Sequence, residues 1–518
     1  MQSQGVLWLI AGNDKELNVA STGRIIAGAA GSGTGTIGAG TIYNYGVMHS
    51  FGNLNLDASD SLTNTSTGGI SAGDTLSMIG ANYLSNYGAL YAKYVNLLGW
   101  QITNYVSGTM DADSELAMGV VLNNAGYSKI SNKGKITSGG SIYISGSFDN
   151  FNSAYRNEPK PSVIAAGDIT IRAASANGLK SASMTNGVNA LLSAGGAMTI
   201  TGDLGYAADY FYNGGTIRAG SLTISKFIEA DNGSNAGSPS SASVTKRTAT
   251  ATAYPGLDLT LPTNPNGRYV TTASSNSQYL VESNPLYTNL DNYLGSDYLA
   301  EKYNFNSDTV TKRLGDAAYE THLVETQLVA LTGTAMLSGS TSEKTQMQAL
   351  MDSAGTQAKS LGLTYGTALT AAQQANLSSD MVWMVATVVN GQTVLAPVVY
   401  LSAKTKTLFE DESGTGGIAA KTVTIANVGA ITNSGSIKGD TLSLTATGNI
   451  KNEGGTIAGN DSVRVVSTNG NVINKTQVNT DGKGNATVGN EASITSKGSL
   501  VVAAERSIVN EGATMCID

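Results

Sequence analysis

The sequence predicts a mainly β fold: a right-handed parallel β-helix (solenoid) in two arms, interrupted by a helical module of about 120 residues. Two observations predict the arms. A short phrase that contains glycine recurs before an alternating strand, and Gly is abundant, with 62 Gly in 518 residues. A third observation predicts the interruption, because the composition changes between about residues 238 and 404.

The recurring phrase is an aliphatic residue, one or two small residues and Gly, as in Ile164-Ala-Ala-Gly-Asp168. The spacings Ile164 to Leu192 and Leu192 to Ile217 are 28 and 25 residues, and Ile437 to Ile457 is 20. Alternation of apolar with small polar residues after the phrase predicts strands with one buried face. Because one coil of this length cannot bury its apolar face alone, the coils are expected to stack.

Asparagine and glycine between the strands are interpreted as corners. Asn213-Gly214-Gly215, Asn433-Ser-Gly435 and Asn452-Glu-Gly454 each precede the phrase. Both residue types tolerate the positive φ that tight corners need. A β-sandwich with turn-rich loops is the alternative, but it would not be expected to repeat one phrase at the period of a coil.

The middle of the chain has helical rather than alternating patterns. Helices are expected over Leu290–Tyr303, Asp308–Leu331, Ser342–Leu361 and Thr370 to about Val389, followed by a hairpin or edge strand over Val394–Leu401. The predicted domains are therefore a solenoid arm (1–235), a Ser/Thr/Pro-rich linker (236–275), the helical module (276–404) and a second solenoid arm (405–518).

Composition excludes several classes of function. The net charge of −8 argues against a nucleic-acid binder. A single Cys and two His, His49 and His322, leave little for a metal centre or for histidine catalysis, so no cofactor and no enzyme activity are expected. His322 is expected to be a solvated or hydrogen-bonded residue of a helix.

Short motifs in the middle of the chain carry a family resemblance. They are Tyr279-Leu-Val-Glu-Ser-Asn-Pro285, Gly295-Ser-Asp-Tyr-Leu299, Lys312-Arg-Leu-Gly-Asp316, Leu331-Thr-Gly333, Gln348-Ala-Leu-Met-Asp352 and Ser379-Asp-Met-Val-Trp383. This series resembles a module of the large CdiA-type contact-dependent inhibition proteins. The flanks resemble the haemagglutinin repeats of filamentous-haemagglutinin-type exoproteins, which Gram-negative bacteria export by two-partner secretion. One departure is Ala317-Ala318, where relatives usually carry a Gly-aromatic pair.

The resemblance implies structural or recognition roles for the motif positions. These are Tyr279, Glu282, Pro285, Ser296, Asp297, Tyr298, Lys312, Arg313, Leu314, Gly315, Asp316, Gly333, Leu350, Met351, Asp352, Asp380, Trp383 and Tyr400. Paired carboxylates can do acid/base work. The four aspartates are instead expected to cap helices or to anchor buried hydrogen bonds, and Trp383 is expected in the core.

The resemblance also implies a function: a non-enzymatic stalk and binding segment of a secreted, cell-surface adhesin or contact-dependent inhibition protein. The implied partners are an outer-membrane or host cell-surface receptor and an outer-membrane secretion partner, with the chain itself monomeric. No export signal is visible, so that signal is expected in a missing N-terminal part. A β-helical polysaccharide-degrading enzyme and a fragment of a decayed exoprotein gene are the alternatives.

A group of tyrosines in the first arm has two interpretations. It comprises Tyr43, Tyr45, Tyr83, Tyr87, Tyr91, Tyr94 and Tyr105. Exposed tyrosines would suit recognition of proteins or sugars. Alternatively, the rings stack along successive coils.

Overall fold

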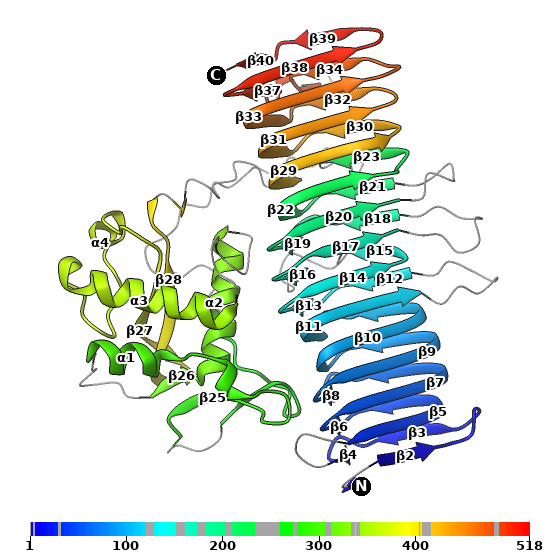
Figure 1. Cartoon of the computed structure of the whole chain (residues 1–518), viewed down its shortest axis with the longest axis vertical. Helices are drawn as coiled ribbons and strands as arrows, with labels where there is room; N and C mark the ends of the chain where they lie inside the picture. Colours follow the sequence, from blue (N-terminus) through cyan, green and yellow to red (C-terminus); the bar gives the residue numbers. More distant parts are fainter. Residues whose placement is uncertain are drawn as a thin grey trace.

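Stacked parallel strands form one long column, and a compact module lies beside it (Figure 1). The computed structural model describes residues 2–3, 6–28, 33–120, 129–151, 161–173, 183–202, 210–233, 259–272, 277–305, 312–332, 337, 342–403, 405–406, 416–480 and 486–517. The chain climbs the column from its N-terminal coils to its C-terminal coils, and each coil pairs in parallel with the next. The fold is therefore mainly β and solenoid-like.

The strands of successive coils stack in three rows, and long strands run through a corner from one row into the next. The first row contains β1 (Gln2–Ser3), β4 (Arg24–Ala27), β6 (Val47–Ser50), β8 (Gly69–Ala72), the starts of β10 (Ala89–Asn104) and β11 (Thr109–Val120), β13 (Lys135–Ser138), β16 (Ser162–Ala165), β19 (Leu191–Ala194), the starts of β22 (Thr216–Ser225), β29 (Gly417–Val428), β31 (Ser436–Ala446) and β33 (Thr456–Ser467), β37 (Ser493–Ser496) and β40 (Thr514–Ile517).

The second row follows the first around the coil. It contains β2 (Val6–Ile10), β5 (Thr34–Asn44), β7 (Asn53–Asn64), β9 (Thr75–Asn86), the later parts of β10, β11, β22, β29, β31 and β33, β14 (Ser141–Ser145), β17 (Ile169–Arg172), β20 (Ala197–Thr201) and β38 (Ser499–Ala504).

The third row closes each coil. It contains β3 (Glu16–Val19), the ends of β5, β7, β9 and β10, β12 (Lys129–Asn132), β15 (Ser147–Asn150), β18 (Ser183–Asn186), β21 (Tyr210–Asn213), β23 (Glu229–Asn232), β30 (Ala430–Asn433), β32 (Ile450–Glu453), β34 (Val472–Lys475) and β39 (Ile508–Glu511). A small hairpin of β35 (Val478–Thr480) and β36 (Ala486–Val488) leaves the column after β34.

Alternation within the strands builds the core of the column. Inward aliphatic residues such as Ile136, Ile142 and Ile169 are fully buried. They belong to one apolar cluster, which includes coils that precede the inserted module in the sequence and coils that follow it. Burial of each such side chain contributes roughly 1.5–3 kcal/mol. A coil therefore gains most of its stability from its two neighbours.

A buried ladder of asparagines runs along one corner of the column. Each member donates a side-chain hydrogen bond of 2.7–2.9 Å to the next: Asn44, Asn64, Asn86, Asn104, Asn132, Asn150, Asn186, Asn213, Asn232, Asn433, Asn452, Asn474 and Asn510. Glycine and asparagine together were expected to supply positive φ at the corners. This is confirmed at Gly454, which has a φ of 67°, but none of the ladder asparagines has a positive φ. They hold the corner through their amide groups instead.

The two predicted arms are one continuous column. β22 pairs with β29 and β23 pairs with β30, although residues 234–415 separate them in the sequence. The register shows where the insertion lies: Asn213 is opposite Asn232, and Thr216 is opposite Gly417. Gly233 and Gly416 thus occupy the two corner positions that Gly214 and Gly215 occupy one coil earlier.

The inserted module combines a five-stranded sheet with helices. Its strands lie in the order β24 (Tyr269–Thr271), β25 (Tyr279–Ser283), β26 (Arg313–Gly315), β28 (Gln392–Tyr400) and β27 (Met381–Val389). Its helices are η2 (Leu290–Asn292), α1 (Ser296–Tyr303), α2 (Ala317–Thr332), α3 (Glu343–Leu361) and α4 (Ala371–Ala375). The helix expected over Ser342–Leu361 is confirmed as α3, with Ser342 as its N-cap in a capping box.

Two of the expected helices were wrong in part. The helix expected from Asp308 begins only at Ala317, because Arg313–Gly315 forms β26 between β25 and β28. The third helix ends at Ala375, and Met381–Val389 is a strand. Its first five residues, Met381–Val385, are a continuous apolar run that is buried on both faces, and such a run has no period that separates a strand from a helix.

The hairpin expected near Val394 is confirmed, with Asn390 and Gly391 at its turn. It is not an edge strand, since β28 lies between β26 and β27. Pro397 is tolerated there because β28 pairs with β26 only at Leu395. Beyond that point the Gln327 side chain replaces a strand: it donates to the Pro397 carbonyl (2.8 Å) and accepts from the Val399 N–H (3.0 Å).

Candidate functional site: the docking face and polar clusters of the module

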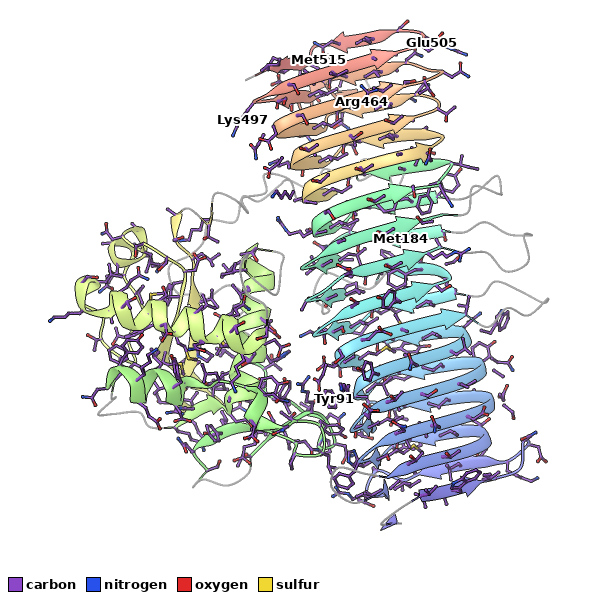
Figure 2. The ribbon with its side chains drawn as sticks, in the orientation of Figure 1. Tyr91, Met184, Arg464, Lys497, Glu505 and Met515 are labelled. Carbon is purple, nitrogen blue, oxygen red and sulfur yellow. The ribbon has the colours of Figure 1, made fainter. Side chains whose placement is uncertain are left out.

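The module covers one outward row of column side chains, here called the docking face: His49, Ser71, Tyr91, Asp111 and Thr137, from β6, β8, β10, β11 and β13. The strand register places these residues side by side in successive coils. His49, Ser71 and Tyr91 are buried. Figure 2 shows Tyr91 at the junction between column and module.

Arg268 makes the main polar contact between the module and the docking face. Its guanidinium pairs with the Asp111 carboxylate and donates a 2.6 Å hydrogen bond to the Tyr293 hydroxyl. The guanidinium carbon also lies 4.7 Å from the centre of the Tyr91 ring and 5.5 Å from that of Tyr269. A desolvated cation over aromatic faces is stabilised by about 2 kcal/mol or more. Arg268 therefore joins two coils of the column to the edge of the module sheet.

A hydrogen bond from a module side chain to the column backbone also fixes the module on the neighbouring corner. The Asn266 side chain donates to the Thr67 carbonyl at 3.0 Å. The Tyr287 hydroxyl donates to the Asn266 carbonyl at 2.7 Å and lies beside Ser71. A Cβ on Gly69 would lie 2.2 Å from the Asn266 carbonyl oxygen, so only glycine allows this approach.

A cavity of about 360 Å³ lies between the column and the module. Thr109 and Lys135 line it from the column, and Tyr269, His322 and Glu325 line it from the module. His322 was expected to be a solvated or hydrogen-bonded helical residue. It is the hydrogen-bonded kind, in α2, with its Nδ1 atom 3.5 Å from Lys135 Nζ.

Two ionisable groups of the cavity, Glu325 and His322, have pKa values shifted toward their neutral forms. Burial, together with the neighbouring Glu343 carboxylate, raises the pKa of Glu325 well above its usual value. Burial and the nearby cations Lys135 and Arg268 hold the pKa of His322 well below its usual value. The cavity thus places a neutral carboxyl group and a neutral imidazole beside the cations Lys135 and Arg268.

Four of the motif residues meet in one partly buried cluster of the module. Ser296, at the start of α1, donates its N–H (2.6 Å) and its hydroxyl (2.7 Å) to the Glu320 carboxylate of α2. Arg313 pairs with Asp297, and the Tyr279 hydroxyl lies 3.4 Å from the same carboxylate. Burial raises the pKa of Glu320 to about 7, although the bonds from Ser296 lower it in part.

A second cluster joins α1 to α3 through Asp352. The hydroxyl groups of Tyr298 and Tyr303 lie 2.8 and 3.0 Å from its Oδ1 atom, and Lys302 Nζ lies at 2.7 Å. Burial alone would raise the pKa of Asp352, but these hydrogen bonds bring it below its usual value. The carboxylate is therefore saturated by its own neighbours.

The other two aspartates of the motifs anchor backbone. Asp316 accepts from the Tyr319 N–H (3.0 Å) at the start of α2 and from the Ser283 N–H (2.6 Å). Asp380 accepts from the Ser402 N–H and the Thr405 hydroxyl, each at 2.7 Å.

The remaining motif positions are spread through the module rather than gathered in a site. Leu314, Leu350, Met351, Trp383 and Tyr400 are buried in its apolar core. Lys312 donates to Gln392, and Glu282 accepts from Ser277. A Cβ on Gly315 would lie 2.3 Å from the Tyr319 side chain. Pro285 lies between β25 and η2, and Gly333 lies outside the described residues.

Sequence reasoning missed Arg268 and Asp111, which join the module to the column, and Glu320, which joins α2 to α1 within the module. These residues lie in no recognised motif, and each gains its importance from a partner elsewhere in the sequence. The tyrosines of the first arm divide between both interpretations. Tyr87 stacks on Tyr105 with ring centres 3.8 Å apart, whereas Tyr45 and Tyr83 are exposed.

Within the described part of the chain, no group of three or more His, Cys, Asp or Glu side chains is arranged to hold a metal ion. In the same residues, no helix combines the length and the apolar character that a membrane crossing would require.

Comparison with known proteins finds partial homology to CdiA proteins. The chain is 38% identical over 220 residues to a tRNA nuclease CdiA of Yersinia mollaretii, 39% over 196 residues to tRNA nuclease CdiA-2 of Burkholderia pseudomallei, and 36% over 241 residues to a 16S rRNA endonuclease CdiA of Enterobacter cloacae. These matches cover 38%, 37% and 41% of this chain. No family model and no solved structure matches the chain.

The matched stretch is 7%, 6% and 7% of the three relatives, so this chain corresponds to a small segment of proteins that are far longer. The resemblance to CdiA-type contact-dependent inhibition proteins is thereby confirmed as partial homology. That homology implies an exoprotein family that is secreted or held at the cell surface.

Proposed function

We propose that this chain is a non-enzymatic stalk and binding segment of a secreted, cell-surface CdiA-type exoprotein, and that it mediates adhesion or recognition of a target cell. The observation that carries the proposal is the unbroken column with a module mounted on its side. A stack with one continuous asparagine ladder is suited to act as a stiff spacer. The side module offers a surface that the column alone lacks.

The column is best described as a right-handed parallel β-helix, because parallel strand crossovers are right-handed in about 98% of cases. The partners that suit this role are an outer-membrane or host cell-surface receptor for the module and an outer-membrane secretion partner for export. We propose no cofactor. The carboxylates of the motifs support a structural role, since Asp316, Asp352 and Asp380 accept hydrogen bonds from their own module.

The register of the insertion supplies a matched control for the binding test. Deletion of residues 234–415 would join Gly233 to Gly416, and the joined segment would match the corner Asn213-Gly214-Gly215-Thr216 one coil earlier. The two glycine backbones already touch: a Cβ on Gly416 would lie 2.7 Å from the Gly233 nitrogen. The shortened column is expected to fold, which circular dichroism and a cooperative thermal transition would verify.

The test compares binding of the labelled full chain and of the shortened column to Gram-negative and epithelial cells. Saturable binding by the full chain, with none by the shortened column, would support recognition by the module. Equal binding by both would move recognition to the column. Absence of binding by both folded proteins would refute the binding role and leave the spacer role.

A further inference from the structure

The two histidines of this 518-residue chain both lie where the module meets the column. His49 is part of the docking face on β6, and His322 projects from α2 into the cavity between the two bodies. Histidine is the side chain whose ordinary pKa lies closest to mildly acidic pH. The interface therefore contains both histidines that this chain could use to sense acid.

His49 has no place for a second proton while the module is docked. The residue is 2% exposed, and its Nδ1 atom shares a 2.7 Å hydrogen bond with the Ser71 hydroxyl. Its Nε2 atom is buried without a hydrogen-bond partner among the described residues. Tyr287 of the module lies beside the same Ser71. A charged imidazole would thus bury an unsatisfied N–H beneath the module, which is costly.

His322 is neutral in the docked state for a different geometric reason. Its Nδ1 atom faces the Lys135 ammonium at 3.5 Å, across the boundary between module and column. A neutral ring can accept a hydrogen bond from that ammonium. A protonated ring would place a second cation against it, and like charges at this distance repel.

We propose that acidification releases the module from the docking face, with His49 and His322 as the two groups whose protonation drives the release. Release would let each ring meet water, and it would separate His322 from Lys135. The module would then remain attached only through the chain on either side of it, and the row of Ser71, Tyr91 and Asp111 would become exposed.

The charged and titratable neighbours of each histidine decide whether its protonation is favoured or opposed in the docked state. Around His49 they are Arg24 and Tyr287, and the cation opposes protonation. Around His322 they are Lys135, Arg268, Asp111, Tyr269, Tyr293, Tyr319, Glu325 and Glu343.

Buried carboxyl groups act against release. Burial raises the pKa of Glu325 and of Asp113, so acid favours their docked, protonated forms. Part of the Glu325 shift persists after release, because Glu343 belongs to the same module. The Tyr91 hydroxyl donates to Asp113 at 2.5 Å within the column, and this bond lowers the pKa of Asp113 both before and after release. Variants of the histidines separate the effect of histidine protonation, which favours release, from that of carboxyl protonation, which opposes it.

The expected size of the change in the docking equilibrium follows from the pKa shift of His49. Burial lowers the pKa of His49 from 6.5 to about 4 in the docked state. If release restores the ordinary value, the docking equilibrium at about pH 5 falls roughly 30-fold from this residue alone. His322 adds to the fall in the same direction.

The test is small-angle X-ray scattering of the full chain from about pH 7.5 to about pH 4.5, with circular dichroism at each step to verify the fold. The wild-type protein is expected to expand as the module leaves the column. The matched variant is His49→Asn with His322→Asn, because the asparagine amide oxygen lies near the position of Nδ1. It should stay compact at the pH where the wild type has expanded.

Hydrogen exchange of residues 69–72 and 89–92 provides a second measurement, since these strand segments lie on the docking face and lose their cover only when the module leaves. The single His49→Asn and His322→Asn variants should each shift the transition to lower pH. A wild type that stays docked down to about pH 4.5 would overturn the proposal. Expansion of the double variant at the wild-type pH would overturn it as well.

Discussion

At the scale of single residues, the module contains a carboxyl group, Glu320, whose pKa is raised by burial to near neutral pH. Glu320 is 1% exposed and accepts two hydrogen bonds from Ser296. Its pKa of about 7 in the fold lies above the ordinary 4.5. The folded state therefore binds an extra proton between these values, and this contribution to stability is lost as the pH rises from about 4.5 to about 7.

We expect the unfolding free energy of the wild type to fall by about 3 kcal/mol from this group between about pH 4.5 and pH 8. Glu320→Gln, which stays neutral, should remove that part of the pH dependence. Urea unfolding followed by the fluorescence of the buried Trp383 measures it. The control is Asp352→Asn, whose carboxyl has its pKa shifted in the opposite direction. Equal pH slopes for the wild type and Glu320→Gln would contradict this account.

The asparagine ladder gives a second residue-scale prediction. Asn132 accepts from Asn104 and from the Gly134 N–H, and it donates to Asn150 and to the Ser162 carbonyl. Asn132→Leu keeps the volume but leaves several buried groups unpaired, at about 1–3 kcal/mol each.

We expect Asn132→Leu to lower the unfolding free energy by at least about 3 kcal/mol in chemical denaturation. Asn510→Leu is the matched control, because Asn510 ends the ladder at an exposed position, where water can replace the lost partners. Its cost should be below about 1 kcal/mol. Similar losses for both variants would mean that the ladder contributes little beyond its volume.

The ladder also shows how far sequence reasoning reached at this scale. Asn213, Asn433 and Asn452 were recognised as corner residues from their position before the recurring phrase. Their role was misjudged, because a positive φ is a local property, whereas the ladder depends on the coil above and the coil below. Arg268 was missed for the same reason, since its partner Asp111 lies on another body of the molecule.

At the scale of elements, the column strands were predictable and part of the module was not. Column strands alternate, and one buried face gives them a period that a single sequence displays. In the module, the first half of β27 is buried on both faces, and β26 is three residues long and depends on its neighbours in the sheet. Helix α3, with its capping box and one apolar face, and the start of α4, with a capping box at Thr370, were predictable from the local sequence.

The corners between strands require glycine where coils approach closely. A Cβ on Gly88 would lie 2.2 Å from the Gly68 carbonyl oxygen and 2.3 Å from that of Thr65, both backbone atoms that cannot move aside. Gly88→Ala is therefore expected to lower the thermal midpoint of the column by several degrees, in line with a loss of about 2 kcal/mol or more.

Gly38→Ala is the control for this substitution, since a Cβ there would meet only the Asp57 carbonyl oxygen at 3.9 Å. Calorimetry should give a clearly lower thermal midpoint for Gly88→Ala than for Gly38→Ala. If Gly88→Ala and Gly38→Ala had the same thermal midpoint, the corner at Gly88 would be able to accommodate a Cβ atom despite the short backbone distances.

At the scale of the whole molecule, the column and the module meet through a few polar contacts rather than through a shared core. Their apolar clusters are separate: one runs along the column, and two lie within the module. Such an arrangement allows the module to move as a unit, and it makes Arg268 the decisive contact at neutral pH.

Arg268→Met is expected to weaken docking by about 3–5 kcal/mol, because it leaves the Asp111 carboxylate partly buried without its partner. Scattering at neutral pH should then show an expanded molecule with unchanged circular dichroism. The double variant Arg268→Met with Asp111→Asn tests the cause, since removal of the orphaned charge should restore part of the docking. If the double variant were as expanded as the single one, the stacking of Arg268 on Tyr91 and Tyr269, rather than its ion pair, would hold the module on the column.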